Sequence, residues 1–143
     1  MKRTVAIVVA AALVIAALVI LLVPGKETKL SSQIVIYAYD SFTAEWGPGP
    51  QIKEAFEDKT GITVRFESLG DAGQVLQKAI MVKGDPKADI LLGIDNNMLS
   101  KAKSESVFTP YRPEGADKLP DQLVFDEEFE VTPFDYGYFS IIY

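Results

Sequence analysis

The stretch IYAYDSFTAEWGPGP, residues 36–50, passes from a strand pattern through a polar and aromatic loop to the start of a helix. Residues 33–39, QIVIYAY, are rich in the β-branched and aromatic types that are typical of strands. Pro48 and Pro50 suit the first turn of a helix, where a missing N–H breaks no hydrogen bond. The pattern therefore predicts a strand, a loop and a helix over residues 51–59.

The loop between that strand and that helix is a predicted binding site. It begins at Asp40, directly after the strand. In α/β proteins, ligands bind just outside the carboxyl ends of parallel strands. We therefore expect four side chains near a ligand: Tyr39, Asp40, Ser41 and Trp46. The alternative for Tyr39 and Trp46 is that they are ordinary packing aromatics.

The first 25 residues form a separate segment, which we predict to be a transmembrane anchor or a signal segment. Residues 5–23 are unbroken apolar, and nineteen residues of helix span about 28 Å, close to the thickness of a bilayer core. Lys2 and Arg3 precede them, which predicts a cytoplasmic N-terminus and an extracytoplasmic remainder. A cleaved signal peptide is the alternative, but no Ala-x-Ala cleavage pattern follows the run. Residues 26–32 are then a short linker.

Composition excludes several classes of site. The chain has no cysteine, so it has neither a disulfide nor a lipid-modified cysteine anchor. It has no histidine, which removes the commonest general base and the Ser-His-Asp and Cys-His nucleophile arrangements. The formal net charge of −6 disfavours binding to nucleic acid. We therefore expect no enzymatic activity, no cofactor and no nucleic-acid partner.

The remaining chain, residues 33–143, is predicted to form one α/β lobe with a parallel sheet. The first helix carries an apolar stripe of Ile52, Ala55 and Phe56. Gly61 stands after it, where a C-terminal cap belongs. The run at 88–93, ADILLG, has the composition of a strand that is buried on both faces and therefore central. The alternation of strands and helices predicts a parallel sheet with covering helices. The further predicted elements are a strand at 62–67, a turn at 68–73, a helix at 75–82 and a helix capped by Asn96 or Asn97 that ends near Ser104.

The end of the sequence is expected to differ from this regular part. Residues 107–130 contain several prolines and little periodicity, so we expect an irregular connection. Residues 130–143, EVTPFDYGYFSIIY, are again rich in strand-forming residues and predict a last strand. An unpaired apolar strand is an aggregation hazard, so the sequence is interpreted as the front part of a longer protein.

Five motifs in a fixed order resemble the thiamine-binding proteins of bacterial and archaeal ABC importers. They are YAYDSF with WGPGP, then LGDAG, KADILLGIDNN and PFDYGYF, spread over residues 37–139. The resemblance implies a type II periplasmic-binding-protein fold, in which two α/β lobes joined by crossing strands close on a ligand. This chain matches the first lobe and the first crossing strand, and is truncated there.

The resemblance also implies which residues contact a ligand. Asp71 and Ala72 fall where the family contacts thiamine or its phosphate, and Gly73 compensates for the glycine that is usual in place of Ala72. Tyr39 and Trp46 fall at aromatic positions near the pyrimidine and thiazolium rings. A thiazolium is a fixed cation, and an aromatic face attracts cations.

Four further residues are assigned by the same resemblance or by their position. Asp40 and Asp95 are expected to add charge complementarity, with a simple helix-entry role as the alternative for Asp95. Asp135 and Tyr136 fall where the chain crosses between lobes, and are therefore hinge or cleft residues by resemblance. Plain sheet packing is the alternative for both.

The leading prediction is an extracytoplasmic receptor that binds thiamine or a thiamine phosphate and passes it to an ABC transporter permease. The same fold also serves receptors for other cationic solutes, such as polyamines or iron. A metal-dependent hydrolase is a less favoured alternative, in which Asp40, Asp71 and Asp95 bind Mg²⁺. The last alternative is a non-functional remnant of a receptor.

Overall fold

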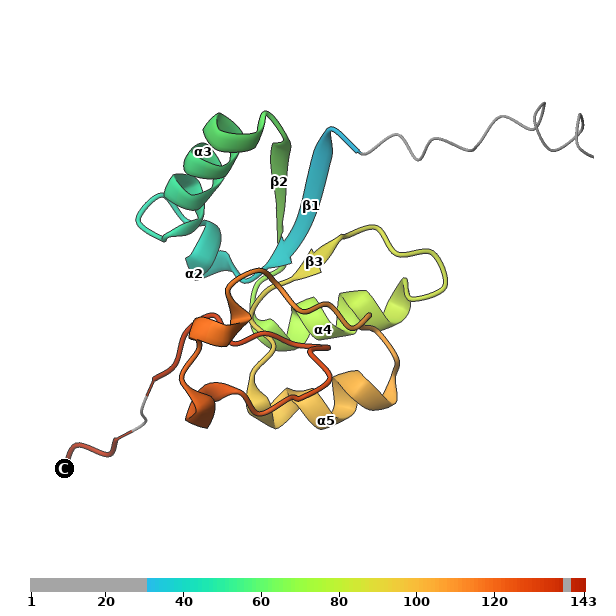
Figure 1. Ribbon diagram of the computed structural model, residues 1–143. Helices are drawn as coiled ribbons and strands as arrows, with labels where there is room; N and C mark the ends of the chain where they lie inside the picture. The colour runs from blue at the N-terminus through green and yellow to red at the C-terminus, as the bar shows by residue number, and fades with distance from the viewer. Residues whose placement is uncertain (1–30, 138–139) are drawn as a thin grey trace, which may run out of the picture. The chain divides into compact units, whose positions relative to one another are not determined.

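The computed structural model describes residues 31–137 and 140–143 (Figure 1). The chain divides into two units, Met1–Ser31 and Ser32–Tyr143, and every element described below lies in the second. The predicted membrane segment at residues 5–23 lies outside the described residues. Within the described part, no helix has both the length and the apolar character needed to cross a bilayer.

The sheet is parallel, as the sequence predicts. Its strands are β1 (Gln33–Ala38), β2 (Thr63–Ser68) and β3 (Ile90–Leu91), in the order β2-β1-β3. β1 pairs with β2 over its whole length, from Gln33 opposite Thr63 to Ala38 opposite Ser68. The carboxyl ends of β1 and β2 therefore lie side by side, which brings the loops that follow them together.

The predicted central position of residues 88–93 is wrong for the described sheet, because β1 lies in the middle and β3 lies at the edge. β3 is also short, since only Ile90 and Leu91 form the strand, and Ile90 is 44% exposed. Gly93 has a φ of 108°, a backbone conformation that an extended strand does not adopt. The apolar run therefore turns away from the sheet after two paired residues.

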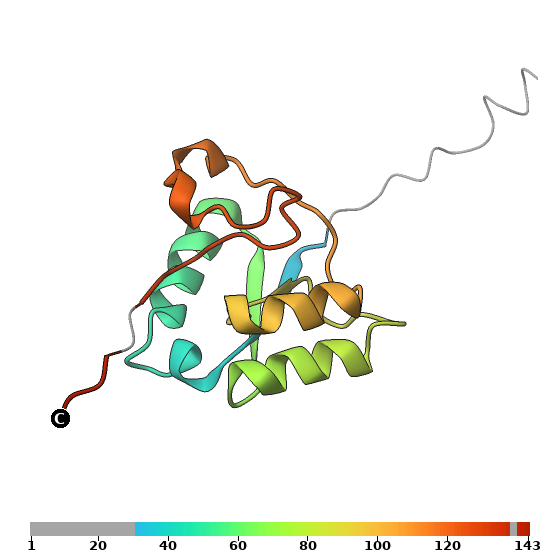
Figure 2. The same ribbon diagram turned by 90° about the horizontal axis from the view of Figure 1, so that it is seen from below.

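The helices cover the sheet in the order that the sequence predicts. α3 contacts β2, α4 contacts both β1 and β3, and α5 runs beside α4 in both views (Figures 1 and 2). One additional short helix, α2, replaces the start of the predicted loop and contacts α3 and β2. The bounds are α2 Asp40–Thr43, α3 Gly49–Thr60, α4 Ala72–Met81 and α5 Asn96–Ser104.

The ends of α3 follow from its sequence. Pro48 is its N-cap and Pro50 lies in its first turn, so the helix begins slightly earlier than the predicted residue 51. Gly61 ends it with a φ of 70°, and the Gly61 N–H donates to the Glu57 carbonyl at 2.8 Å. This left-handed cap confirms the predicted role of Gly61.

The hydrophobic core contains a cluster of aromatic rings around Phe42. The Phe42 side chain is 2% exposed. Its ring makes edge-to-face contacts with Tyr39, Phe66 and Phe134, with centroid separations of 5.9, 5.7 and 5.8 Å. Such pairs add about 0.5–1.5 kcal/mol each to simple burial. Phe42 therefore joins β1, β2 and the C-terminal segment at the carboxyl edge of the sheet.

The segment after α5 is irregular, as predicted, except for two short 3₁₀ turns at Ala116–Lys118 and Asp121–Leu123. The predicted strand at 130–143 is wrong, because its described residues contain no strand. Its backbone is engaged elsewhere: the Val131 N–H donates to the Asp126 side chain at 3.0 Å. Pro133 lacks a donor altogether.

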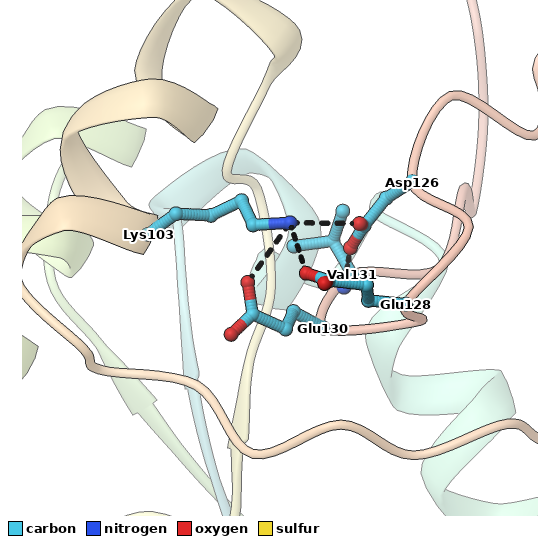
Figure 3. Close-up of polar contacts among 5 residues, drawn as sticks. All are labelled: Lys103, Asp126, Glu128, Glu130 and Val131. Carbon is cyan, nitrogen blue, oxygen red and sulfur yellow. Dashed lines mark hydrogen bonds and ion pairs between the residues drawn. The ribbon is translucent and has the colours of Figure 1, made fainter.

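One lysine ties this segment to the helices. The ammonium of Lys103, on α5, lies 2.9, 3.1 and 3.0 Å from carboxylate oxygens of Asp126, Glu128 and Glu130 (Figure 3). Hydrogen bonds with Asp126, Glu130 and Glu128, in that order of effect, raise the pKa of Lys103 above its usual range. Three carboxylates around one cation fix the 126–130 turn against α5.

Candidate functional site

A large open hollow lies where the three strands end. Its volume is about 1510 Å³, and it is bounded by the residues that follow each strand and by the C-terminal segment. It brings together seven of the ten residues that the sequence singles out: Tyr39, Ser41, Asp71, Ala72, Asp95, Asp135 and Tyr136. Asp40, Trp46 and Gly73 do not line it.

Tyr39 is fixed at the edge of this hollow by close neighbours. Besides its contact with Phe42, its ring lies so close to Gly93 that a Cβ on Gly93 would come within 2.5 Å of the Tyr39 Cδ1 atom. Burial and, secondarily, the negative charge of Asp135 raise the pKa of the Tyr39 hydroxyl. The ring is therefore held in place next to a carboxylate from the C-terminal segment.

Asp40 makes contacts within the protein. One of its carboxylate oxygens, Oδ1, accepts hydrogen bonds from the Ser68 hydroxyl and, at 2.9 Å, from the Gly70 N–H. These two hydrogen bonds lower the pKa of Asp40 below its usual value. The side chain thus connects the end of β1 to the turn after β2.

The Asp71, Ala72, Gly73 turn forms the start of α4. The Asp71 Oδ1 atom accepts a hydrogen bond from the Gln74 N–H at 2.9 Å, so Asp71 is the N-cap of the helix. A Cβ on Gly73 would lie 3.1 Å from that same oxygen, so the glycine leaves room for the cap. Ala72 and Gly73 are the first two residues of the helix, where backbone N–H groups have no intrahelical acceptor.

Asp95 is a helix-entry residue that also lines the hollow. Its Oδ1 atom accepts from the N–H groups of Asn97 and Met98 at 2.9 and 3.0 Å. The predicted caps, Asn96 and Asn97, are instead the first two residues of α5, because the Asp95 side chain, one residue earlier, accepts the hydrogen bonds of the capping position.

The remaining three candidates lie at the surface. Trp46 is 80% exposed in the connection between α2 and α3, so the packing alternative for Trp46 is wrong. Asp135 and Tyr136 are exposed on the C-terminal segment, where the described residues form no strand, so sheet packing is wrong for them as well. Both face the hollow that Tyr39 also lines.

Sequence reasoning missed Ser68, Gly70 and Gly93. Gly70 has a φ of 80° and Gly93 has a φ of 108°, and both precede helix-entry residues at the hollow. The signal was a glycine shortly before an aspartate, in LGD after β2 and in GID after β3. A positive φ at such a position favours glycine strongly.

The structure gives no support to a metal site. Within residues 31–137 and 140–143, no group of three or more acidic side chains is arranged so that it could hold a metal ion. Asp40, Asp71 and Asp95 instead accept hydrogen bonds from nearby N–H and O–H groups. The alternative of a Mg²⁺-dependent hydrolase therefore loses the carboxylate cluster on which it depended.

Comparison with known proteins shows that this lobe is similar to the thiamine-binding periplasmic proteins. No protein-family model matches the chain. It is 37% identical over 129 residues to the thiamine-binding periplasmic protein of Brucella abortus, which covers 87% of this chain and 36% of that protein. It is 38% identical to the protein of the same name from Salmonella typhimurium, over 77% of this chain and 33% of that protein. It is 37% identical to the Escherichia coli protein of this name, over 77% of this chain and 33% of that protein.

Solved structures agree with these sequence relatives. A periplasmic thiamin binding protein superposes with a TM-score of 0.58 and 33% identity, over 68% of this chain and 31% of that one. A Trichodesmium protein in complex with iron and citrate gives a TM-score of 0.54 at 19% identity, which shows the fold alone. The chain spans about a third of the length of the relatives it matches, and the resemblance drawn from its motifs is confirmed.

Proposed function

We propose, from the similarity of this chain to one third of the thiamine-binding periplasmic proteins, that it forms one side of a receptor for thiamine or a thiamine phosphate. The receptor delivers its ligand to an ABC transporter permease. Thiamine is cargo in this proposal, so the chain needs neither a catalytic residue nor a cofactor. The observation that carries the proposal is the hollow at the strand ends, together with the names of the relatives.

The chemistry of the hollow supports a ligand with both a ring cation and a phosphate. The N–H group of Ala72, which lines the hollow at the start of α4, suits a phosphate oxygen. The Tyr39 face and the Asp135 carboxylate suit the thiazolium cation, since a cation over an aromatic ring contributes about 0.5–2 kcal/mol. Asp95 and Tyr136 add a further charge and ring at the rim. Trp46 lies outside the hollow, so in this proposal the ligand extends from the hollow toward the loop after α2 and stacks on Trp46 there.

The full chain should bind thiamine weakly, because a one-sided site leaves most of the ligand in water. Titration of the full chain in detergent micelles, followed by NMR, is expected to give a dissociation constant on the order of 1 mM. The amide signals of Ala72 and Gly73 should move with thiamine monophosphate and not with spermidine at the same concentration. Equal responses to both ligands would contradict the assignment to thiamine, and nanomolar affinity would contradict the one-sided site.

The proposed location is the extracytoplasmic face of the cytoplasmic membrane, with residues 5–23 as an uncleaved anchor. Two observations support this location: the apolar run follows Lys2 and Arg3, and the similar proteins are named as periplasmic. Membrane fractionation with mass measurement of the N-terminus tests it. A full-length, detergent-released protein is expected, whereas a soluble form beginning near residue 26 would show cleavage.

A further inference from the structure

Asp40 and Gly70 hold each other through two reciprocal hydrogen bonds. The Asp40 N–H donates to the Gly70 carbonyl at 2.8 Å, and the Gly70 N–H donates to the Asp40 Oδ1 atom at 2.9 Å. Both polar groups of the Gly70 backbone are thus bound by one residue from the other loop. The two loops that follow β1 and β2 are thereby joined just beyond the paired strands.

Two hydroxyl groups complete this contact. The Ser68 hydroxyl donates to the same Asp40 Oδ1 atom, and the Ser68 and Thr43 hydroxyl oxygens lie 2.8 Å apart. Thr43 in turn donates to the Asp40 carbonyl at 3.1 Å. The Asp40 carboxylate therefore accepts two hydrogen bonds from the end of β2 and the turn after it, which an alanine at position 40 cannot replace.

The turn that Asp40 holds leads directly into the proposed ligand site. Gly70 has a φ of 80°, and the next residue, Asp71, is the N-cap of α4. The orientation of the Gly70 peptide consequently sets the direction in which Asp71 and the Ala72 N–H point. Asp40 itself does not line the hollow.

We propose that Asp40 is a positioning residue, which fixes the Gly70 turn and thereby aims the first N–H groups of α4 at the ligand. This inference rests on the proposed function, because it concerns the same site. It differs from the role expected from the sequence, in which the Asp40 charge attracts the thiazolium directly. The two roles predict different effects of removing the charge while keeping an oxygen acceptor.

The test compares three variants of the full chain: Asp40→Ala, Asp40→Asn and Ser68→Ala. Asp58→Ala is the matched control, because Asp58 is an exposed acid on α3 that takes no part in the hydrogen bonds of this turn. Hydrogen exchange of the Gly70 amide is measured by NMR without ligand, and thiamine monophosphate is then titrated. In Asp40→Ala the Gly70 amide should exchange about tenfold faster, in line with the loss of one hydrogen bond.

Binding of thiamine monophosphate should weaken about three- to tenfold in Asp40→Ala, less in Ser68→Ala, and hardly at all in Asp40→Asn or Asp58→Ala. Rescue by asparagine identifies positioning, because asparagine keeps the acceptor and removes the charge. If Asp40→Asn weakens binding as much as Asp40→Ala, a direct charge contact replaces the proposed role.

The Gly70 amide separates this inference from the proposed function. Faster Gly70 exchange in Asp40→Ala with no response to thiamine monophosphate in any variant would support the hydrogen-bonded turn and contradict the thiamine assignment. Unchanged Gly70 exchange, or unchanged binding despite faster exchange, would overturn the positioning role itself.

Discussion

Residues 33–104 and residues 105–137 are held in place by different kinds of contact. The first region buries side chains of successive elements against one another, and Tyr37 and Val75 are at most 1% exposed. The second has little regular structure and two buried apolar residues, Ala116 and Phe129, and it is also held by the carboxylates around Lys103 and by Phe134 on Phe42. The hollow lies between these two regions, so one wall is firm and the other depends on few contacts.

This difference indicates where the proposed site can change shape. Segments with few buried apolar contacts open at a lower free energy than the core of the same protein. Tyr39, Asp71 and Asp95 lie on the firm side, whereas Asp135 and Tyr136 lie on the weakly held segment. The two groups of candidate residues should therefore respond differently to substitution.

The substitution Phe42→Ala should have the largest effect on stability, because Phe42 belongs to the core and also contacts the C-terminal segment. Loss of a buried phenylalanine costs about 3–5 kcal/mol. Urea unfolding of the full chain in detergent, followed by far-ultraviolet circular dichroism, measures this change. A loss below about 1 kcal/mol would mean that Phe42 is not the common support of the two regions.

Phe134→Ala is the matched comparison on the other side of the same contact. Phe134 is 59% exposed, so its loss should cost only about 0.5–1.5 kcal/mol, the value of one aromatic pair. Hydrogen exchange should increase in residues 126–137 and stay unchanged in β1 and β2. A similar increase in both regions would remove the distinction between them.

Acid should loosen the C-terminal segment before the core unfolds. Burial raises the pKa of Asp126, but hydrogen bonds from Lys103 and the Val131 N–H outweigh it, so this pKa lies below its usual 3.8. A carboxyl whose pKa is lowered by folding stabilises the folded state above its usual pKa, and this contribution is lost as the pH falls through the lowered value. The contact should therefore hold at neutral pH and fail only as the pH falls through a value below the usual 3.8.

The measurement is hydrogen exchange of the Val131 amide as a function of pH, corrected for the intrinsic pH dependence of exchange. Lys103→Met is the control, because it removes the cation and keeps much of the side-chain length. In that variant the protection of Val131 should already fall at neutral pH. Equal protection in the parent and in Lys103→Met would show that Lys103 does not hold the segment.

Much of the regular region was predictable from its residues. The strand and helix order, the parallel pairing and the Gly61 cap all follow from local patterns such as QIVIYAY and a glycine after an amphipathic run. The elements and the cap depend on neighbours in the sequence. The parallel pairing is a tertiary contact, but the alternation of strands with helices predicts it.

The errors arose where hydrogen bonds and backbone turns, rather than residue type, decide the structure. The strand-like composition of residues 130–143 gave no sign that Val131 and Asp126 bond to each other, and the apolar run at 88–93 did not reveal the turn at Gly93. For the site, the sequence located the strand-end residues that meet at the hollow. It could not show that Asp40 contacts Ser68 and Gly70, because that contact spans about thirty residues of chain.

The central claim is that this lobe forms one side of a functional thiamine-binding site. A chimera tests it, in which residues 33–137 replace the matching part of the Escherichia coli thiamine-binding periplasmic protein, so that a second lobe is present. Tyr39→Ala and Trp46→Ala in this chimera remove the two predicted ring contacts, and Trp46→Ala should leave stability within about 0.5 kcal/mol because the side chain is exposed.

Calorimetry of thiamine binding to the chimera is the most direct measurement. We predict submicromolar affinity, stronger than about 8 kcal/mol of binding free energy. Tyr39→Ala and Trp46→Ala should each weaken binding by about 1–3 kcal/mol through lost stacking on the ligand rings. A correctly folded chimera that does not bind thiamine, or one that binds equally well with Tyr39 replaced, would contradict the account.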